Sequence, residues 1–498
     1  MALTKYMGTE TEFGITVVGR PDFNPVLASS MVVNAYTADG HPRARWDYEE
    51  ENPLRDARGF TQPGAPDVPP SDDIGLANSI LTNGARFYVD HAHPEYSSPE
   101  CSNPRDIVVW DKAGERILEQ AADRAQALLS SAGQGPSRMV ITKNNTDGKG
   151  AAYGMHENYI VDRRVPFGKL VRQIIPFFVS RQLMVGAGRI GNEFELSGVP
   201  YQIAQRADFF EVEVGLETTL KRPLVNTRDE PHADPERFRR LHVIIGDANM
   251  SEICTYLKVG SCALVLSMIE DGFMADPPAL AKPVKALHEL SHDLTCTRAV
   301  DLKDGRRITG VELQWYYLEH ARKYHETRDT PDWTGDVLAT WERVLTALED
   351  DPMQLDGVVD WVTKHQLLRR YAERDNLAWD HPRLALIDVQ YHDVRQDKGL
   401  YNHLAAKGRC ERLVDETEVQ AAMSTPPEDT RAWFRGRCLD KFRASVTAAG
   451  WDAIIFDVGG DTLQRVPMMD PGRGSKAMTE ELIQRCDTAA ELIDALQG

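Results

Sequence analysis

The sequence predicts an α+β protein with a small C-terminal α/β domain, and three observations lead to this prediction. Strand-like segments are concentrated in the first half of the 498 residues, and the segment from about 251 to 407 is mostly amphipathic helix. A Pro-Pro break at 426–427 then precedes two further strands and a helix. Runs of strands followed by runs of helices are typical of α+β folds. We place the boundary between a large domain (1–423) and a small one (424–498).

The individual elements follow from hydrophobic periodicity. Residues 6–18, "YMGTETEFGITVV", alternate and are rich in Thr and Val, which predicts a first strand. Apolar residues recur at three and four over 104–133, which predicts a helix, and the same spacing predicts helices over 336–351 and 361–376. Further strands are expected around 138–145, 156–162, 209–215 and 240–247. Residues 451–471 are expected to form two strands, followed by one helix from Lys476 to the end.

A long loop is expected over about 39–74. This segment contains Pro63, Pro66, Pro69 and Pro70, runs of charge and little periodicity. Long structureless loops inside compact domains are usually functional or mobile, although a disordered surface insertion has the same composition. We expect a mobile loop that regulates access to a site and does not contribute to the core.

Composition and charge exclude several classes of protein. With 42% hydrophobic and 27% charged residues the chain is typical of a globular protein, and its net charge of -19 argues against a nucleic-acid binder. The start "MALTKYMGTE" has no apolar run of secretory length, and no uninterrupted membrane-length segment is recognised. Seven scattered cysteines without a CxxC pair predict reduced thiols. We therefore expect a soluble cytoplasmic protein that binds neither nucleic acid nor membrane.

The stretch 87–100, "FYVDHAHPEYSSPE", places titratable groups where a buried strand begins. Side chains alternate along a strand, so Arg86, Tyr88 and Asp90 share one face while Phe87 and Val89 occupy the other. Buried charges cost several kcal/mol unless they are paired or bind a cation. The polar face is therefore expected to point at a ligand.

Other segments carry residues of the same kind. Further candidates are Glu10, Glu12, Glu95, Glu100, His156 and His242. A single Glu or His is more often a solvated edge or a satisfied buried group, so the prediction depends on a fold that brings these residues together. Carboxylates outnumber imidazoles in the set, which favours Mg²⁺ over Zn²⁺. The zinc alternative uses His91 and His93 of "HAH", and the following Pro94 disfavours the extended chain that would align them.

Phosphate could be bound either by a glycine-rich loop or by arginine side chains. No GxxxxGK[ST] pattern is present, and "GAGRIG" at 186–191 matches GxGxxG but is followed by a turn and a strand where a dinucleotide site needs a helix. Arginine side chains could bind phosphate or carboxylate instead. The candidates are Arg206, Arg228, Arg239 and Arg240, each of which could equally form a surface ion pair.

Several long motifs resemble one family over nearly the whole chain. They are "GTETEFGI", "LTNGARFYVDHAHPEYSSPE", "WDKAGERILE", "KNNTDGKGAAYGMHENY", "NTRDEPHADPERFRRLHVIIGDANMSE" and "DKGLYNHLAAKG". Together they resemble the family of Pup-processing enzymes that contains the deamidase and depupylase Dop and the ligase PafA. The long segment ahead of "NGAR" and the short form "VDHAHPEY" resemble the Dop branch.

The resemblance implies a fold and an activity. It implies a glutamine synthetase-like fold, in which a curved antiparallel sheet forms a cradle packed with helices. The implied activity is hydrolysis of the isopeptide bond between the C-terminal glutamate side chain of Pup and a substrate lysine, together with deamidation of the C-terminal glutamine of Pup. Such a hydrolase serves the pathway of proteasomal protein degradation, with Pup and pupylated proteins as its partners.

The resemblance also implies roles for individual residues. Asp90 matches the catalytic aspartate, and the nucleotide is expected to be required without being consumed in each turnover. The implied magnesium ligands are Glu10, Tyr88, Glu95, His156 and His242. The implied ATP contacts are Arg86, Ser98 and Trp451, to which the phosphate argument adds Arg206 and Arg240. Because Pup is acidic, part of the basic run over 220–242 is expected to line its groove, with Arg228 and Arg239 as candidates and Glu12 and Glu100 as further acidic site residues.

Two alternative functions stay open at this point. One is a ligase of the same fold, either a Pup ligase or a small-molecule carboxylate–amine ligase, which would release ADP with each product. The other is a non-catalytic nucleotide-binding module that recruits pupylated proteins, and the costly cluster of Asp90, Glu10 and Glu95 speaks against it. A monomer is compatible with the sequence.

Overall fold

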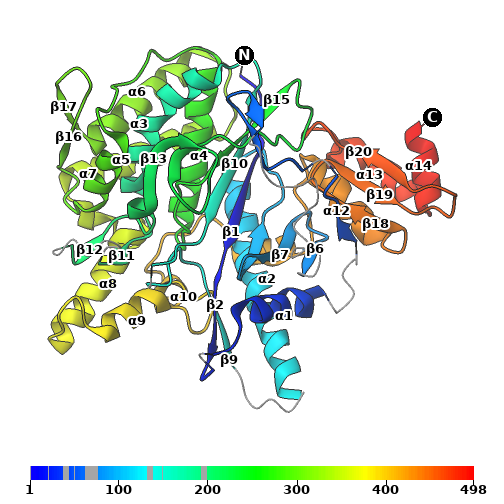
Figure 1. Cartoon of the computed structure of the whole chain (residues 1–498), viewed down its shortest axis with the longest axis horizontal. Coiled ribbons are helices and arrows are strands. Elements are labelled where there is room, and N and C mark those ends of the chain that lie inside the picture. The colour runs from blue at the N-terminus through cyan, green and yellow to red at the C-terminus, as the bar shows by residue number, and fades with distance from the viewer. Residues whose placement is uncertain are drawn as a thin grey trace.

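A six-stranded antiparallel sheet runs through the middle of the molecule in the order β15-β10-β1-β8-β7-β6 (Figure 1). The structure is a computed structural model and describes residues 2–20, 22–37, 44–49, 51–61, 77–131, 138–148, 150–191 and 199–497. The strands of this central sheet are β1 (Met7–Glu12), β6 (Asn78–Ile80), β7 (Arg86–Asp90), β8 (His93–Ser97), β10 (Met155–Asp162) and β15 (Phe238–Val243).

The two faces of the central sheet differ in chemistry because side chains alternate along each strand. On β10, Tyr159 and Val161 are buried in the main hydrophobic core, whereas His156 and Asn158 lie on the opposite face. On β7, Phe87 and Val89 are buried while the alternate residues are only partly covered. One face therefore packs on helices and the other carries polar groups.

The helices outside the C-terminal residues contribute to the main hydrophobic core and to smaller clusters beside it, one of which covers Phe87 and Val89 of the sheet (Figure 1). The long ones are α2 (Pro104–Ser131), α3 (Phe167–Val185), α4 (Glu252–Glu270), α6 (Gly310–Thr327), α7 (Thr334–Asp350) and α8 (Asp360–Asp375). The shorter ones are α1 (Pro25–Thr37), α5 (Pro283–Ser291), α9 (Pro382–Tyr391), α10 (Leu400–Ala406) and α11 (Glu416–Ala422), with 3₁₀ turns η2 (Ala207–Phe209) and η3 (Pro352–Leu355).

Helix α4 has the length and composition of a membrane span, with a mean hydropathy of 1.5 over 18 residues. The sequence predicted no uninterrupted membrane-length segment, and Lys258 interrupts the apolar run of this helix. That window is 94% buried inside the protein, and Lys258 within it donates hydrogen bonds to the backbone oxygen of Asp247 and to Asn249 Oδ1. Helix α4 is thus the central helix of the core.

The C-terminal residues form a smaller layer at one side of the molecule (Figure 1). Its elements are α12 (Arg431–Lys441), β18 (Val446–Ala449), β19 (Ala453–Phe456), β20 (Gln464–Pro467), α13 (Lys476–Arg485) and α14 (Ala489–Gln497). They share a separate hydrophobic cluster, and the sheet order is β20-β19-β18-β3. Strand β3 (Arg45–Trp46) thus joins this layer from far away in the sequence. The domain boundary after 423 stays a prediction.

Short ladders complete the fold. The pairs are β2 (Gly14–Val18) with β9 (Arg138–Thr142), β4 (Arg55–Asp56) with β5 (Phe60–Thr61), β11 (Arg189–Ile190) with β12 (Tyr201–Gln202), β13 (Phe210–Gly215) with β14 (Arg222–Asn226), and β16 (Ala299–Asp301) with β17 (Arg307–Thr309). Strands β13 and β14 are parallel, and the other pairs are antiparallel.

Most predicted elements are confirmed, and a few are corrected. The expected first strand is two strands, β1 and β2, which belong to different sheets. The expected single C-terminal helix is two helices, α13 and α14, separated at 486–488. The mostly helical segment 251–407 also contains the β16–β17 hairpin. The motif at 186–191 follows α3 and enters β11, so it does not open a helix.

The segment predicted as a structureless loop contains three short strands in its described part, β3, β4 and β5. Its residues 39–43, 50 and 62–74 lie outside the described residues. Trp46 is buried against the C-terminal layer, and Asp56 is buried and accepts a 2.7 Å hydrogen bond from Thr227 Oγ1. Ala57 N donates to Thr227 O at 2.7 Å. The expectation that this segment stays out of the core is therefore wrong for Ala44 and Trp46, whereas in 51–61 Asp56 alone is buried and no residue joins a hydrophobic cluster.

Candidate active site

The polar face of the central sheet lines a cavity of about 780 Å³, which we call the first cavity. Strand pairing places its groups side by side: Glu10 is opposite His156, Glu12 is opposite Glu95, and Tyr88 is opposite Glu95 on the next strand. The antiparallel register thus brings together residues that are more than 200 positions apart in the sequence. Members of the predicted set on this wall are Glu10, Glu12, Tyr88, Asp90, Glu95, His156 and His242.

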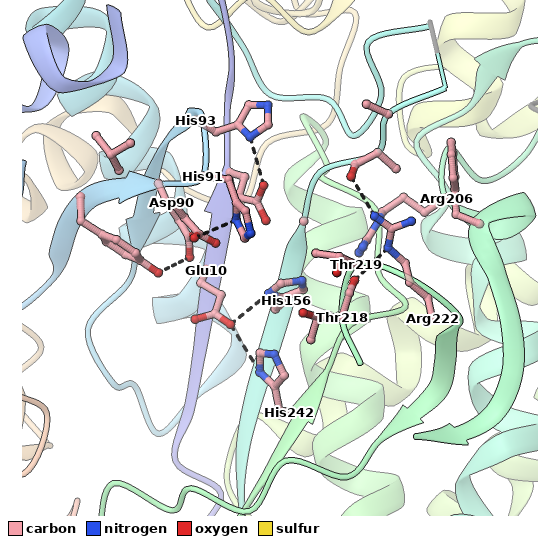
Figure 2. Close-up of a pocket in the computed structure, with 18 of the residues that line it drawn as sticks. Glu10, Asp90, His91, His93, His156, Arg206, Thr218, Thr219, Arg222 and His242 are labelled. Carbon is pink, nitrogen blue, oxygen red and sulfur yellow. Dashed lines mark hydrogen bonds and ion pairs between the residues drawn. The ribbon is translucent and has the colours of Figure 1, made fainter. Parts of the chain in front are cut away.

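Glu10 is the centre of a carboxylate–imidazole group (Figure 2). Its Oε1 lies 3.1 Å from His156 Nδ1 and 3.4 Å from His242 Nδ1. His242 Nδ1 also lies 2.9 Å from Asn158 Oδ1. Burial raises the pKa of Glu10, but the hydrogen bond from His156 and the charges of both imidazoles outweigh it and lower that pKa overall. One ligand atom from each of the three residues lies within 4.8 Å of the others, which suits one cation.

Three carboxylates form a second group next to the first. Ligand atoms of Glu12, Asp90 and Glu95 lie within 4.8 Å of one another, and Tyr88 donates a 2.5 Å hydrogen bond to Glu95 Oε1. Burial and the neighbouring carboxylates raise the pKa of Glu95 well above its ordinary range. Like charges gathered in this way are costly without a counter-ion, so the chemistry of the group fits a hard divalent cation.

Asp90 ends strand β7 at the mouth of this group. His91 follows it in the turn of a hairpin with φ 51°, and its Nδ1 lies 2.9 Å from Asp90 Oδ1. Burial raises the pKa of Asp90, but the hydrogen bond and charge of His91 outweigh it and lower that pKa overall. The lowered pKa keeps the Asp90 carboxylate ionised. Because the Asp90 side chain is 38% exposed, the carboxylate is also accessible from the cavity. These are the properties that a nucleophile or a general base requires.

The zinc alternative finds no shared site for its two histidines. The tight turn at 91–92 separates His91 from His93, which pairs with Asp90 on the adjacent strand. His93 Nδ1 lies 3.2 Å from Glu12 Oε2, and its ring stacks on Tyr153. The two imidazoles thus contact different carboxylates.

A second, smaller cavity of about 80 Å³ adjoins the first at Glu10. Three predicted nucleotide contacts line it, namely Ser98, Arg240 and Trp451. Ser98 Oγ accepts a 2.9 Å hydrogen bond from Thr9 N, and Arg240 Nη1 donates to Asn158 Oδ1 at 2.8 Å. Asn158 therefore connects the second cavity to His242 of the first.

Arg86 lies in the first cavity, with its guanidinium carbon 3.9 Å from the ring centroids of both Trp46 and Tyr88. Its Nε donates to Asn78 Oδ1 at 3.1 Å. Trp46 in turn contacts Trp451 edge to face, with ring centroids 5.3 Å apart. Trp46 of strand β3 therefore links Arg86 to the C-terminal layer.

Four arginines were predicted as phosphate or Pup contacts, and they separate into two groups. Arg206 and Arg228 line the first cavity and Arg240 the second. Arg239 lines neither, because alternation along β15 turns it to the opposite face, where it donates to Val165 O at 2.9 Å and packs over Phe167. The structure thus does not bring Arg239 to the site.

Glu100 has a different role from the one expected. Its carboxylate accepts hydrogen bonds from Arg431 Nε at 2.6 Å and from Arg435 Nη2, both on α12. Burial raises the pKa of Glu100, and the charges of and hydrogen bonds from the two arginines outweigh it and lower that pKa to about 2. Glu100 lines the second cavity, but its oxygens are engaged in attaching the C-terminal layer to the central sheet.

Replacing Glu100 should therefore affect stability. Glu100→Gln leaves two buried guanidiniums without their carboxylate, and we expect the free energy of unfolding to fall by about 3–5 kcal/mol. The matched control Glu428→Gln breaks an exposed pair with Lys476 and should cost about 1 kcal/mol or less. Chemical denaturation of both variants measures this. Because the folded-state pKa of Glu100 is depressed, its contribution is present above the ordinary pKa of about 4.3 and is lost as the pH falls through 2. Equal stability of both variants at pH 7 would refute the assignment.

Sequence reasoning missed several residues of the site. Asn158, Glu51 and Arg222 were not predicted as site residues, although Asn158 lies in the motif that ends at Tyr159 and Arg222 lies in the basic run 220–242. Gly154 had a readable signal in its position just before His156. A Cβ on Gly154 would lie 2.6 Å from Glu12 Oε1 and from His156 Nε2, so a side chain there would collide with both cation-binding groups.

Comparisons with known proteins agree with this arrangement. The family described as Pup-ligase protein matches residues 5–455. The chain is 58% identical to the depupylase of Acidothermus cellulolyticus and 50% identical to the Pup deamidase/depupylase of Mycolicibacterium smegmatis, and each match covers 99% of this chain. These matches cover 99% and 100% of the two relatives. The Pup–protein ligase of Kineococcus radiotolerans is 46% identical over 82% of this chain and 90% of its own.

Solved structures confirm the α+β fold with its glutamine synthetase-like sheet. The crystal structure of PafA in complex with Pup superimposes with a TM-score of 0.82 at 33% identity, covering 100% of this chain and 95% of that one. PafA in complex with ADP gives a TM-score of 0.75 at 36% identity, covering 85% and 96%. The family match spans both the central sheet and the residue, Trp451, that the C-terminal layer contributes to the second cavity. On these grounds the chain belongs to the Pup-ligase protein family.

Proposed function

We propose that this protein is a Pup deamidase and depupylase. It hydrolyses the isopeptide bond between the C-terminal glutamate side chain of Pup and a substrate lysine, and it converts a C-terminal glutamine of Pup to glutamate. Both reactions cleave a side-chain amide at the same carbon, so one site serves both. The observation that carries the proposal is the position of Asp90, an accessible carboxylate beside two groups of cation ligands in the first cavity.

The relatives favour a hydrolase over a ligase. Full-length matches at 50–58% identity are to proteins named depupylase or Pup deamidase/depupylase, while the ligase matches cover 82% of the chain. The ligase remains the second candidate because PafA shares the fold.

ATP and Mg²⁺ are the proposed cofactors. The proposed magnesium ligands are Glu10, Tyr88, Glu95, His156 and His242. They line one wall of the first cavity, where ligand atoms of two groups of residues lie close together. The proposed nucleotide contacts are Arg86, Ser98, Arg240 and Trp451. The second cavity meets the first at Glu10, and the related PafA has been solved in complex with ADP. When bound, the cation would supply positive charge that stabilises anionic oxygens.

The residues of the chain supply the remaining chemistry. Asp90 either takes a proton from the water that attacks the side-chain carbonyl carbon and passes it to the leaving amine, or attacks that carbon itself. In the second case the amine leaves with a proton from water, and a water molecule then hydrolyses the acyl–Asp90 anhydride. The His91 contact keeps the Asp90 carboxylate ionised and oriented. The hairpin turn after Asp90 fixes this carboxylate at the edge of the sheet, where the cavity is open.

Partners and location follow from the same proposal. Pup and pupylated proteins are the substrates, as the relatives' activity and the PafA–Pup complex support. We further propose a cytoplasmic location, for which the seven buried cysteines, none in a disulfide, give support.

One assay separates the candidate functions. Purified protein is incubated with a Pup–lysine conjugate, with and without ATP and Mg²⁺, and free Pup and ADP are measured. A hydrolase releases Pup in a nucleotide-dependent way without stoichiometric ADP. ADP formed with each new Pup–lysine bond would instead identify a ligase, and conjugate binding without product would identify a recruiting module.

A further inference from the structure

Three arginines in the first cavity, Arg206, Arg222 and Arg228, have no carboxylate within ion-pair distance among the described residues, and Arg206 and Arg222 are neighbours. Arg206 is 1% exposed, and its Nη1 donates to the backbone oxygens of Ile244 and Gly246. Its buried Nε has no hydrogen-bond acceptor within the described part of the chain. Arg222, at the start of β14, donates from Nε to Thr218 O at 2.9 Å and from Nη2 to Ala152 O at 3.0 Å.

This situation is unusual for arginines buried so deeply. Among described residues, three arginines are less than 2% exposed, and the other two, Arg181 and Arg435, bind Glu157 and Glu100. Burial and the charge of Arg222 lower the pKa of Arg206 to about 10, although the charges of Glu12 and Asp247 act in the opposite direction, so the two guanidiniums repel each other. A buried cation is costly unless an anion is paired with it.

The two guanidiniums lie together on one side of the first cavity, away from Asp90 and the Glu10 group (Figure 2). The cavity thus has an acidic wall suited to cations and a basic wall suited to an oxyanion. A guanidinium fork matches the geometry of a carboxylate or a phosphate.

We propose that Arg206 and Arg222 form a subsite for the free α-carboxylate of the C-terminal residue whose side-chain amide is hydrolysed. The inference rests on the proposed function and reassigns Arg206 from the nucleotide to the substrate. A C-terminal Glu or Gln carries this carboxylate a few bonds from its side-chain carbonyl, so it spans from the basic wall toward Asp90. An internal glutamine has no such group and would leave both guanidiniums unpaired, that of Arg206 in a fully buried position, so the subsite selects chain ends.

The experiment uses two forms of Pup ending in glutamine, one with a free α-carboxylate and one with an α-carboxamide. Side-chain deamidation is followed by mass spectrometry with the full-length enzyme, ATP and Mg²⁺. We expect wild-type kcat/KM to be about 10²–10⁴-fold lower for the carboxamide, as for sites built to bind one polar group. This comparison needs no mutation, so it holds even where a variant fails to fold.

Variants identify the residues. Arg222→Gln should lower kcat/KM for the free acid to within a few-fold of the value for the carboxamide. Arg222→Lys should restore part of the difference in kcat/KM between the two substrates. Arg206→Gln should act in the same direction. Arg239→Gln, a buried arginine of the opposite sheet face, is the control and should keep the full ratio. Thermal unfolding and affinity for Mg·ATP are measured for each variant, and both should stay near wild type.

The outcomes separate the two sources of an oxyanion. If Arg222→Gln or Arg206→Gln weakens ATP affinity and leaves the substrate ratio intact, the arginines bind a nucleotide phosphate and the inference is wrong. Equal wild-type rates on both forms of Pup would also overturn it while leaving the proposed function standing. Absence of activity on the free acid and on a Pup–lysine conjugate would instead refute the proposed function itself.

Discussion

Glu10→Gln should abolish most of the magnesium-dependent affinity for ATP while leaving the protein folded. Gln keeps the size of Glu10 but loses the charge that His156 and His242 approach at 3.1 and 3.4 Å. It also loses a hard anionic ligand, and changes of this kind commonly reduce metal affinity by about 10–100-fold or more. Glu95→Gln should behave alike, because Glu95 belongs to the neighbouring group of three carboxylates.

The melting temperature should respond differently without and with metal. Without metal, Glu10→Gln loses the contacts with His156 and His242 that lower the pKa of Glu10, so the melting temperature should fall modestly although repulsion of Asp90 and Glu95 is relieved. With Mg·ATP, wild type should gain stability by ligand binding and the variant should gain little. Isothermal titration and thermal unfolding, each with and without Mg²⁺, measure both effects. Glu213→Gln, an exposed glutamate on β13 outside both cavities, is the matched control. Unchanged metal-dependent ATP affinity in both Glu10→Gln and Glu95→Gln would refute the magnesium assignment.

The sequence predicted the individual strands of the site better than the pairing that brings these strands together. Alternation alone placed Arg86, Tyr88 and Asp90 on one face of a strand, because that depends only on neighbouring residues. Whether His156 and His242 reach Glu10 depends on which strands pair and in what register. That long-range pairing is set by the fold as a whole, and the family resemblance supplied it in advance.

The errors have physical causes of the same kind. Arg239 and Arg240 are adjacent in a basic run, and only the pleat of β15 decides that Arg240 faces the site while Arg239 does not. Glu100 resembles a site acid in its motif, but two arginines some 330 positions later neutralise it. The Pro-rich segment lacks periodicity, and its Trp46 is nevertheless buried because β18 offers an open edge for β3.

Asp90→Asn should be the most damaging substitution for activity and among the least damaging for binding. Asn retains the size and much of the hydrogen bonding of Asp, but its neutral amide can neither attack a carbonyl carbon nor deprotonate water. Losing a general base typically costs a factor of about 10²–10⁴ in kcat, and losing a nucleophile often costs more.

Binding should survive because the proposed contacts of Pup and ATP are distributed over other residues. These include Arg206 and Arg222 on the basic wall and Trp451 in the second cavity. Asp90 also lies among carboxylates, so its neutralisation reduces repulsion toward other anionic groups in the cavity. The variant is therefore expected to bind conjugates as tightly as wild type or more tightly, and to hold them uncleaved.

Single-turnover cleavage of a Pup–lysine conjugate and equilibrium binding of the same conjugate measure the two properties separately. Asp90→Glu is an informative companion, because it keeps the charge and moves the carboxylate by one methylene, so a partial rate would point to positioning of that charge. His91→Gln tests the neighbour that contacts Asp90 at 2.9 Å and should reduce the rate less than Asp90→Asn does. If Asp90→Asn cleaved within a few-fold of wild type, Asp90 would have only a structural role, and Glu12 and His91, which line the same cavity, would be the next candidates for the base.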